Sequence, residues 1–214
     1  LSSRTPTIKV SGAWALYPMM VKWAEEYQKI YPNVTIEVSA GGAGKGMTDA
    51  LAGLVDIGMV SRDLYPEEIQ SGAFDVVVTK DAVVPTMHKD NPVLNDILTK
   101  GLTMQMFYNI YTAGNITTWG QVVGRADVTD KINVYTRSDA CGAADTWAKY
   151  LGKKQEDLLG VQVYGDPGLL EAVRNDRLGI GFNNIGYAYD LQSKTQVDGI
   201  EVIPIDINGN GQVD

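Results

Sequence analysis

Three glycine-bearing turns in this 214-residue chain have the composition of anion-binding loops. Residues 11–15, 41–46 and 137–143 each follow a predicted strand and open a predicted helix. The first amides of a helix lack partners within it and carry a partial positive charge, and glycine lets such a backbone approach a small group closely. The three turns therefore predict a site for an oxyanion or a carboxylate.

Two arginines stand beside predicted strand ends and are candidate ligand contacts. Arg137 opens the third turn, and its guanidinium group could bind an oxyanion through two parallel hydrogen bonds. A solvated surface charge is the alternative interpretation. Arg62 follows another predicted strand, and an ion pair with Asp63 or Glu67 is the alternative there. Trp14 lies in the first turn, where its ring could cover one side of a ligand.

The elements that would position these residues alternate between strand and helix patterns. One apolar helical face is formed by Met20, Trp23, Ala24, Tyr27 and Tyr31, which recur at helical spacing. This alternation predicts an α/β fold with parallel sheets and helices on both faces. The predicted strands are residues 8–10, 34–38, 56–60, 74–78, 82–87, 132–136, 161–164, 179–182 and 201–205. The later predicted helices are residues 47–54, 92–98, 103–111, 143–151, 169–173 and 185–191.

Two lobes account for this order of elements. We expect residues 1–85 to form the first lobe and residues 86–203 to form the second. Residues 204–214 are expected to return to the first lobe. The last residues read as an unfinished turn, so we also expect the fold to continue beyond Asp214.

Composition limits the classes of function. The net charge of −8, without a visible basic stripe, argues against a nucleic-acid binder. One cysteine allows no internal disulfide, and no apolar run has the length of a membrane span. The polar start of the chain is typical of a processed N-terminus. We expect a periplasmic or extracellular location, with a membrane anchor supplied by a removed N-terminal segment.

The motifs, taken in order, resemble the periplasmic phosphate-binding proteins of ABC importers, which belong to the type II substrate-binding superfamily. Residues 41–46 resemble a Gly-Gly-Ser-Gly-x-Gly turn, and residues 137–143 resemble an Arg-x-x-Gly-Ser-Gly-Thr turn. Residues 56–62, 114–119 and 179–187 resemble further segments of that family. The resemblance covers nearly the whole chain.

This resemblance implies a two-lobe type II periplasmic binding protein fold, each lobe a mostly parallel sheet flanked by helices. It also implies a receptor that holds a small oxyanion such as phosphate between its lobes and delivers it to the membrane permease of an ABC importer. We expect a monomer. Carried over by position, the ligand contacts are Trp14, Ala15, Ala43, Gly44, Lys45, Arg137, Cys141, Gly142 and Ala143.

The chain departs from the family pattern at several of these positions. Ala43 and Cys141 replace serines, and Ala143 replaces a threonine. A carboxylate that some members carry after the third strand falls on Arg62, which adds Arg62 to the candidate contacts. Each unmade hydrogen bond to a buried charge costs about 1–3 kcal/mol. The chain could therefore bind a different anion, a larger organic anion, or phosphate weakly.

Other functions remain open from the sequence. A sensing or adhesive module of the same fold, binding another anion or a small carboxylate, is the main alternative to transport. An enzyme using Cys141 would need a base, and the single histidine, His88, shows no sign of pairing with it. We therefore expect a binding protein without enzymatic activity.

The C-terminal segment matches the first part of a calcium loop. Asp206, Asn208 and Asn210 occupy positions 1, 3 and 5, and Gly211 occupies the position of the sharp turn. The twelfth position of such a loop lies past Asp214. A metal-free Asn/Gly turn is the alternative, and no other cofactor is expected.

Overall fold

The computed structural model describes residues 6–214, and their contacts divide the chain into two compact units. The first unit contains the chain up to Asp81 together with Asp139–Gly142. The second unit contains Ala82–Ser138 and Ala143–Asp214. The chain therefore changes unit three times, and four residues from the middle of the sequence belong to the N-terminal unit.

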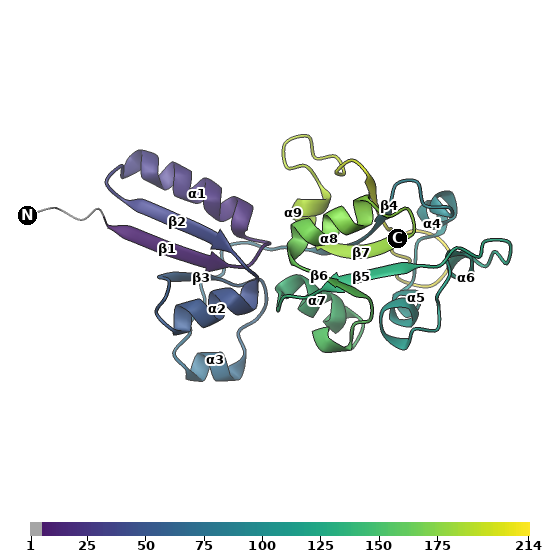
Figure 1. Ribbon diagram of the computed structural model, residues 1–214, viewed down its shortest axis with the longest axis horizontal. Helices are drawn as coiled ribbons and strands as arrows, with labels where there is room; N and C mark the ends of the chain where they lie inside the picture. Colours follow the sequence, from purple (N-terminus) through teal and green to yellow (C-terminus); the bar gives the residue numbers. More distant parts are fainter. Residues whose placement is uncertain (1–5) are drawn as a thin grey trace, which may run out of the picture. The chain divides into compact units, whose positions relative to one another are not determined.

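The sheet of the first unit is parallel, as the strand and helix alternation predicts. Its strand order is β2-β1-β3, and Val10 in the central strand pairs with Val38 on one side and Ile57 on the other (Figure 1). The strands are β1 (Thr7–Gly12), β2 (Thr35–Ala40) and β3 (Ile57–Met59).

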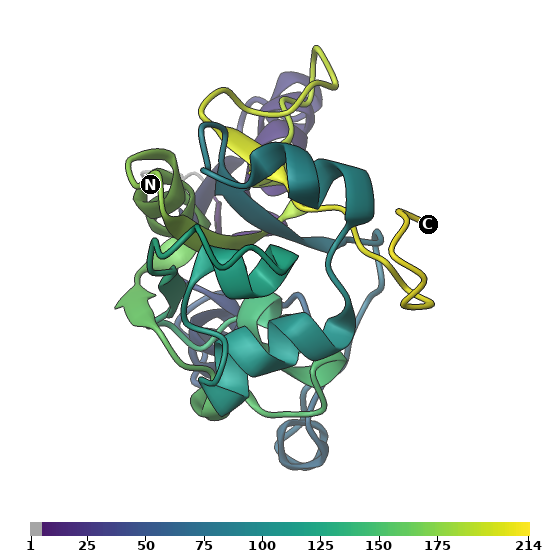
Figure 2. The ribbon, with the colours of Figure 1, turned by 90° about the vertical axis from the view of Figure 1, so that its right-hand side faces the viewer.

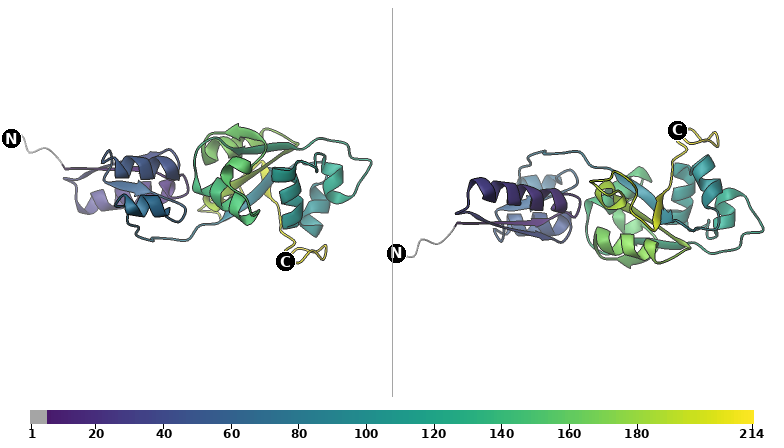
Figure 3. Two further views of the ribbon diagram at one scale, coloured as in Figure 1. Left: turned by 90° about the horizontal axis from the view of Figure 1, so that it is seen from below. Right: turned by 90° about the horizontal axis from the view of Figure 1, so that it is seen from above.

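Helices cover both faces of this sheet. α1 (Tyr17–Ile30) covers one face and α2 (Ala43–Leu51) covers the other (Figure 3). Ile8 and Val10 point towards α1, whereas the Ser11 hydroxyl donates to Asp49 of α2. A short α3 (Pro66–Gln70) follows β3. The predicted apolar face of α1 is only partly covered, because Trp23 and Tyr27 are 40% and 43% exposed.

Residues 74–78 do not form the strand that their apolar composition predicts. They have no regular secondary structure, and Phe74 and Val77 are 86% and 83% exposed. A strand is stabilised by the ladder it shares with a neighbour. Within residues 6–214, β3 pairs with β1 and with no further strand, so this segment finds no ladder beside it.

The second unit has a mixed five-stranded sheet of order β6-β5-β7-β4-β8. β5 runs parallel to β6 and β7, whereas β4 runs antiparallel to β7 and β8. The carboxyl ends of β5 and β7 therefore lie at the same edge. The strands are β4 (Val83–His88), β5 (Asn133–Arg137), β6 (Val161–Val163), β7 (Gly179–Asn184) and β8 (Ile200–Val202).

Helices flank the second sheet (Figure 2), and an aromatic cluster packs within this unit. The Trp147 ring stacks on Phe182 with centroids 5.7 Å apart, and Phe107 meets Trp147 edge-on at 5.0 Å. The helices are α4 (Leu94–Lys100), α5 (Met104–Tyr108), α6 (Trp119–Val123), α7 (Gly142–Tyr150), α8 (Gly165–Arg174), α9 (Ile185–Ala188) and a 3₁₀ turn (Gln155–Asp157).

A π-helical turn interrupts the helix predicted over residues 103–111. The α-helical part ends at Tyr108, and a π-helix continues over Asn109–Ala113. The wider turn leaves the Tyr111 carbonyl to accept a hydrogen bond of 2.7 Å from the Leu159 amide. π-helical turns are rare overall, and those that occur are often found at functional sites.

Residues 204–214 belong to the second unit, whereas the sequence placed them in the first. The Leu102 amide donates to the Pro204 carbonyl at 2.9 Å, and the Asp206 amide donates to the Leu102 carbonyl at 3.1 Å. These bonds hold the C-terminal segment, yellow in Figure 2, beside the start of α5. The unit boundary also lies at Asp81 rather than at residue 85.

Candidate functional site

The first two predicted turns and residues 139–142 of the third meet within the first unit. The amides of Gly41 and Gly42 donate to the Gly12 carbonyl at 3.0 and 3.1 Å, which joins the second turn to the first. The Gly44 amide donates to the Ala140 carbonyl at 3.1 Å, which joins the second turn to the segment of the third that belongs to this unit. Segments about 30 and 100 residues apart along the chain are thus brought to one place.

Glycine is required where the first two turns touch. A Cβ atom on Gly12 would lie 2.2 Å from the Met59 carbonyl oxygen and 2.8 Å from the Gly46 Cα. Gly12 also has φ of +133°, a value that residues other than glycine rarely adopt. The end of β1 and the first turn of α2 therefore pack backbone against backbone, because both positions lack side chains.

The head of α2 carries the amides that the sequence predicts as ligand contacts. Ala43 is fully buried, and neither its amide nor that of Lys45 donates a hydrogen bond within residues 6–214. An unpaired buried amide is costly, so such groups in native proteins usually have a partner. The Gly44 amide donates to the Ala140 carbonyl.

Lys45 forms an ion pair with Asp49 one turn along α2. The Ser11 hydroxyl donates to the same carboxylate at 2.7 Å. The bond from Lys45, followed by that from Ser11, lowers the pKa of Asp49 below its usual range. Lys45 therefore lies next to the α2 head, but its charge is balanced within its own helix.

Arg62 is held in a bidentate ion pair with Glu68. Its two terminal nitrogens donate to the two carboxylate oxygens at 2.9 and 2.6 Å, and its guanidinium group lies 3.7 Å from the centre of the Tyr65 ring. The Arg62 hydrogen bond lowers the pKa of the Glu68 carboxyl. Asp63 and Glu67 were the ion-pair partners predicted from the sequence. Glu68 pairs with Arg62 instead, because the third position of α3 brings its carboxylate to the guanidinium group.

Trp14 and Ala15 lie in the turn before α1, and both are half-buried. The Trp14 ring meets Tyr17 edge-on, with centroids 6.2 Å apart. Tyr17 donates its amide back to the carbonyls of Ala13 and Trp14, which fixes the turn. These residues therefore lie in the turn between β1 and α1, as the sequence predicts.

The third turn packs tightly against Ser61, the second residue after β3. A Cβ atom on Gly142 would lie 2.1 Å from the Ser61 hydroxyl oxygen, and Cys141 is buried. Ser61 was not among the ligand contacts predicted from the sequence. Its position directly after the predicted strand 56–60 was the available signal, because ligands of open α/β sheets bind at the carboxyl ends of strands.

Arg137 and Ala143 belong to the second unit. Arg137 is no surface charge, because its side chain and that of Asp166 are both fully buried. The Arg137 Nη1 donates to the Asp166 Oδ2 at 2.7 Å. Ala143 is buried near the start of α7.

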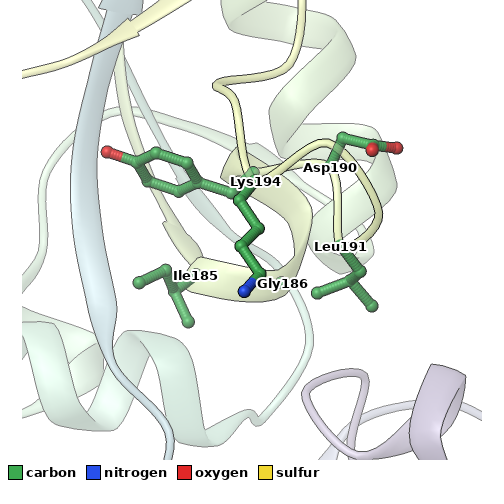
Figure 4. A pocket seen from close by; sticks show the side chains of 6 residues that line it. Ile185, Gly186, Asp190, Leu191 and Lys194 are labelled. Carbon is green, nitrogen blue, oxygen red and sulfur yellow. The ribbon is translucent and has the colours of Figure 1, made fainter.

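Two apolar hollows lie away from these residues. One, of about 340 Å³, lies beside α9 and is lined by Ile185, Leu191 and Lys194, among others (Figure 4). The other, of about 250 Å³, lies between α1 and the first sheet. Their walls are almost entirely apolar, whereas an anion needs converging donors.

Cys141 and the single histidine, His88, belong to different units. His88 belongs to β4 in the second unit, and its Nδ1 accepts a hydrogen bond of 3.0 Å from the Asp90 amide. Within residues 6–214, no three His, Cys, Asp or Glu side chains are grouped as they would be around a metal ion. None of the helices described in this range is long and apolar enough to cross a membrane.

The C-terminal loop is folded around Asp206, which is almost fully buried. Its carboxylate accepts from the amides of Gly209, Asn210 and Gly211 at 2.7–3.2 Å. The Asn208 side-chain oxygen accepts from the Asn210 amide at 3.0 Å. The predicted calcium positions 1, 3 and 5 therefore lie in one tight turn.

A sequence profile of the PBP superfamily domain matches residues 2–212. The chain belongs to the PBP superfamily. Curated relatives include the phosphate-binding protein PstS of Pseudomonas aeruginosa, which is 29% identical over 82% of this chain and 58% of its own length. The phosphate-binding protein PstS of Bacillus subtilis is 26% identical over 91% of this chain and 63% of its own length. This PBP superfamily member therefore spans about three fifths of these relatives.

Solved structures agree with the PBP superfamily assignment. A putative phosphate ABC transporter substrate-binding protein from Clostridium perfringens, solved with bound phosphate, is 29% identical and has a TM-score of 0.80. The match covers 94% of this chain and 76% of that one. An ABC-type phosphate transport receptor from Vibrio cholerae has a TM-score of 0.63 at 23% identity, which supports the fold.

Proposed function

We propose that this chain is the ligand-binding portion of an extracytoplasmic solute receptor that holds a small oxyanion, phosphate in the first instance, for an ABC importer. The observation that carries the proposal is the convergence of the predicted turns on the head of α2, where the buried Ala43 amide has no partner within residues 6–214. Backbone donors at a helix N-terminus suit an anion in an otherwise acidic protein.

The relatives support phosphate as the first ligand to test. The PstS proteins are phosphate-binding by name, and the Clostridium perfringens structure contains bound phosphate. On the same grounds we propose that the chain delivers its ligand to a membrane permease, and that it is periplasmic or extracellular and anchored through a removed N-terminal segment. A receptor of this kind performs no chemistry on its ligand, so we propose no enzymatic activity.

The charges near the turns favour moderate affinity. Lys45 is paired with Asp49, and Arg62 is paired with Glu68. Each pairing offsets part of the attraction that the cation would offer an anion. The hydroxyl groups missing from positions 43, 141 and 143 act in the same direction, although Ser61 supplies one hydroxyl beside the third turn.

The same observations support a second candidate, a sensing or adhesive module that binds a small carboxylate. A carboxylate needs fewer donors than phosphate, because it has two oxygens instead of four. Such a module would keep the α2 head and would not depend on the lost hydroxyls.

Calorimetric titration of the 214-residue protein with phosphate, sulfate, molybdate and small carboxylates tests both candidates. Saturable binding of one phosphate per chain, stronger than that of sulfate, is the expected result. Preferential binding of a carboxylate would support the second candidate instead. If no anion in the panel binds a protein whose circular dichroism shows it folded, the receptor proposal is wrong.

We propose further that the loop containing Asp206, Asn208 and Asn210 binds calcium. Its three side chains offer oxygen at the spacing that calcium loops use, and Gly211 has the positive φ of +80° that the turn needs. Extracellular calcium modules bind with dissociation constants of about 10⁻⁴–10⁻³ M.

Thermal unfolding with and without millimolar calcium tests the loop. We expect calcium, but not magnesium, to raise the melting temperature of the wild type and of Asp198→Asn, an exposed control. Asp206→Asn should abolish that rise. An unchanged melting temperature of the wild type would contradict the assignment.

A further inference from the structure

A buried polar network surrounds Arg137 in the second unit. The Asp166 carboxylate accepts from the Arg137 Nη1 at 2.7 Å, from the Asn184 Nδ2 at 2.7 Å, from the Asn184 amide at 2.9 Å and from the Asn183 Nδ2 at 3.0 Å. All four residues are at most 3% exposed. The carboxylate therefore has four donors and fixed neighbours.

Three elements fix the carboxylate in place. Asp166 is the second residue of α8, where the partial positive charge of a ten-residue helix stabilises an anion. Asn183 and Asn184 end β7, and Arg137 ends the adjacent strand β5. The network thus lies at the carboxyl edge of the second sheet, which is the edge where parallel strands present ligand contacts.

A purely structural ion pair would not need this arrangement. Buried ion pairs are often replaceable by apolar side chains without loss of stability, because desolvation offsets their attraction. Here Asn183 directs its Nδ2 to both the side chain and the backbone carbonyl of Asp166, and its own buried Oδ1 has no hydrogen-bond partner. The network thus satisfies the carboxylate fully while leaving a polar atom of Asn183 unsatisfied.

We propose that Asp166 is a positioning residue for Arg137, which fixes the orientation of the guanidinium group for binding an oxyanion. This inference rests on the receptor function proposed above. A guanidinium group binds an oxyanion well only when its planar donors are aligned with the ligand oxygens. Asp166 fixes that plane from α8 and is itself held by Asn183 and Asn184 at the end of β7.

A double-mutant cycle on phosphate affinity tests this role. We expect Asp166→Asn to weaken phosphate binding about tenfold in the wild-type background and to have no further effect in the Arg137→Gln background, because coupled residues are non-additive. Asp176→Asn is the matched control, since Asp176 also bonds to a β5 side chain, Tyr135, and has no bond to Arg137. It should leave the affinity unchanged. Equal losses from Asp166→Asn in both backgrounds, or no loss, would overturn the proposal.

If Asp166→Asn does not fold, a second variant and a ligand-free measurement still test the proposal. Asp166→Glu keeps the charge but moves the carboxylate by one C–C bond length, and we expect it to weaken phosphate binding as well. Without ligand, the two Nη resonances of Arg137 should be separate in the wild type and averaged by rotation in the variants. Separate resonances in the variants would contradict the positioning role even if phosphate did not bind, whereas wild-type protein that binds no phosphate would refute only the proposed function.

Discussion

Replacement of Ala43 by proline removes one backbone donor from the head of α2 and adds two ring carbons at a fully buried position. Proline is tolerated at the first position of a helix, where its fixed φ is suitable and no intrahelical bond is lost. Gly42 has ψ of 160°, a value that a residue before proline adopts readily. The Ala43 amide donates no hydrogen bond within residues 6–214, so the substitution breaks none that the fold uses there.

The expected loss of affinity follows from the donor that is deleted. A hydrogen bond to a charged group contributes about 1.5–3 kcal/mol. Its removal should therefore weaken anion binding about 10- to 150-fold. The assay is calorimetric titration with phosphate, with circular dichroism and thermal unfolding to verify the fold.

Met104→Pro is a matched control. Met104 is the first residue of α5 in the second unit, Thr103 has ψ of 159°, and the Met104 amide likewise makes no hydrogen bond within the described residues. This variant should bind phosphate like the wild type. A folded Ala43→Pro protein with wild-type affinity would refute the assignment of the α2 head, and an equal loss in Met104→Pro would show that the effect is not local.

Three further outcomes follow from contacts outside the ligand question. Gly12→Ala should destabilise the first unit by more than about 4 kcal/mol, because its Cβ would overlap backbone, whereas Gly186→Ala, with open space around it, should unfold at or slightly above the wild-type temperature. Burial and the bond to Asp176 raise the pKa of Tyr135 to about 12. The contribution of protonated Tyr135 to stability should therefore be lost as pH rises from 10 to 12. Phenolate absorbance should show that Tyr135 has a lower pKa in the Asp176→Asn variant than in the wild type. The pKa of Glu68 is lowered by its guanidinium partner, so its contribution is present above pH 4.5 and is lost as pH falls through the lower folded value; Glu68→Gln should be less stable than the wild type at neutral pH, with a difference that shrinks in acid denaturation curves.

Local patterns carried much of the fold. The parallel first sheet follows from the strand and helix alternation before residue 60, and the glycine turns follow from spacing at strand ends. The strand predicted for residues 74–78 was wrong, because apolar composition alone does not form a strand without a neighbouring strand to pair with. The segment at 204–214 was placed in the wrong unit because its pairing with Leu102 joins positions about 100 residues apart.

Partners of charged residues were harder to predict. Arg62 pairs with Glu68 instead of Asp63 or Glu67, because a short helix brings the later carboxylate to the guanidinium group. Asp166 lies 29 residues from Arg137 and bonds to it only through the packing of α8 on the sheet. Sequence spacing identifies which residues could bind an anion, whereas tertiary structure decides how much of their charge is already balanced.

The excursion of residues 139–142 into the first unit restricts how this protein can be divided or recombined. A gene fragment ending at residue 81 would encode most of the N-terminal unit without the Ala140 carbonyl that accepts from Gly44. A chimera that takes the first unit from a homologue would therefore also need that homologue's residues at positions 139–142, which lie within the chain of the second unit. Insertions and deletions in the short stretch from Arg137 to Ala143 should be tolerated poorly, which favours co-inheritance of both units as one evolutionary module.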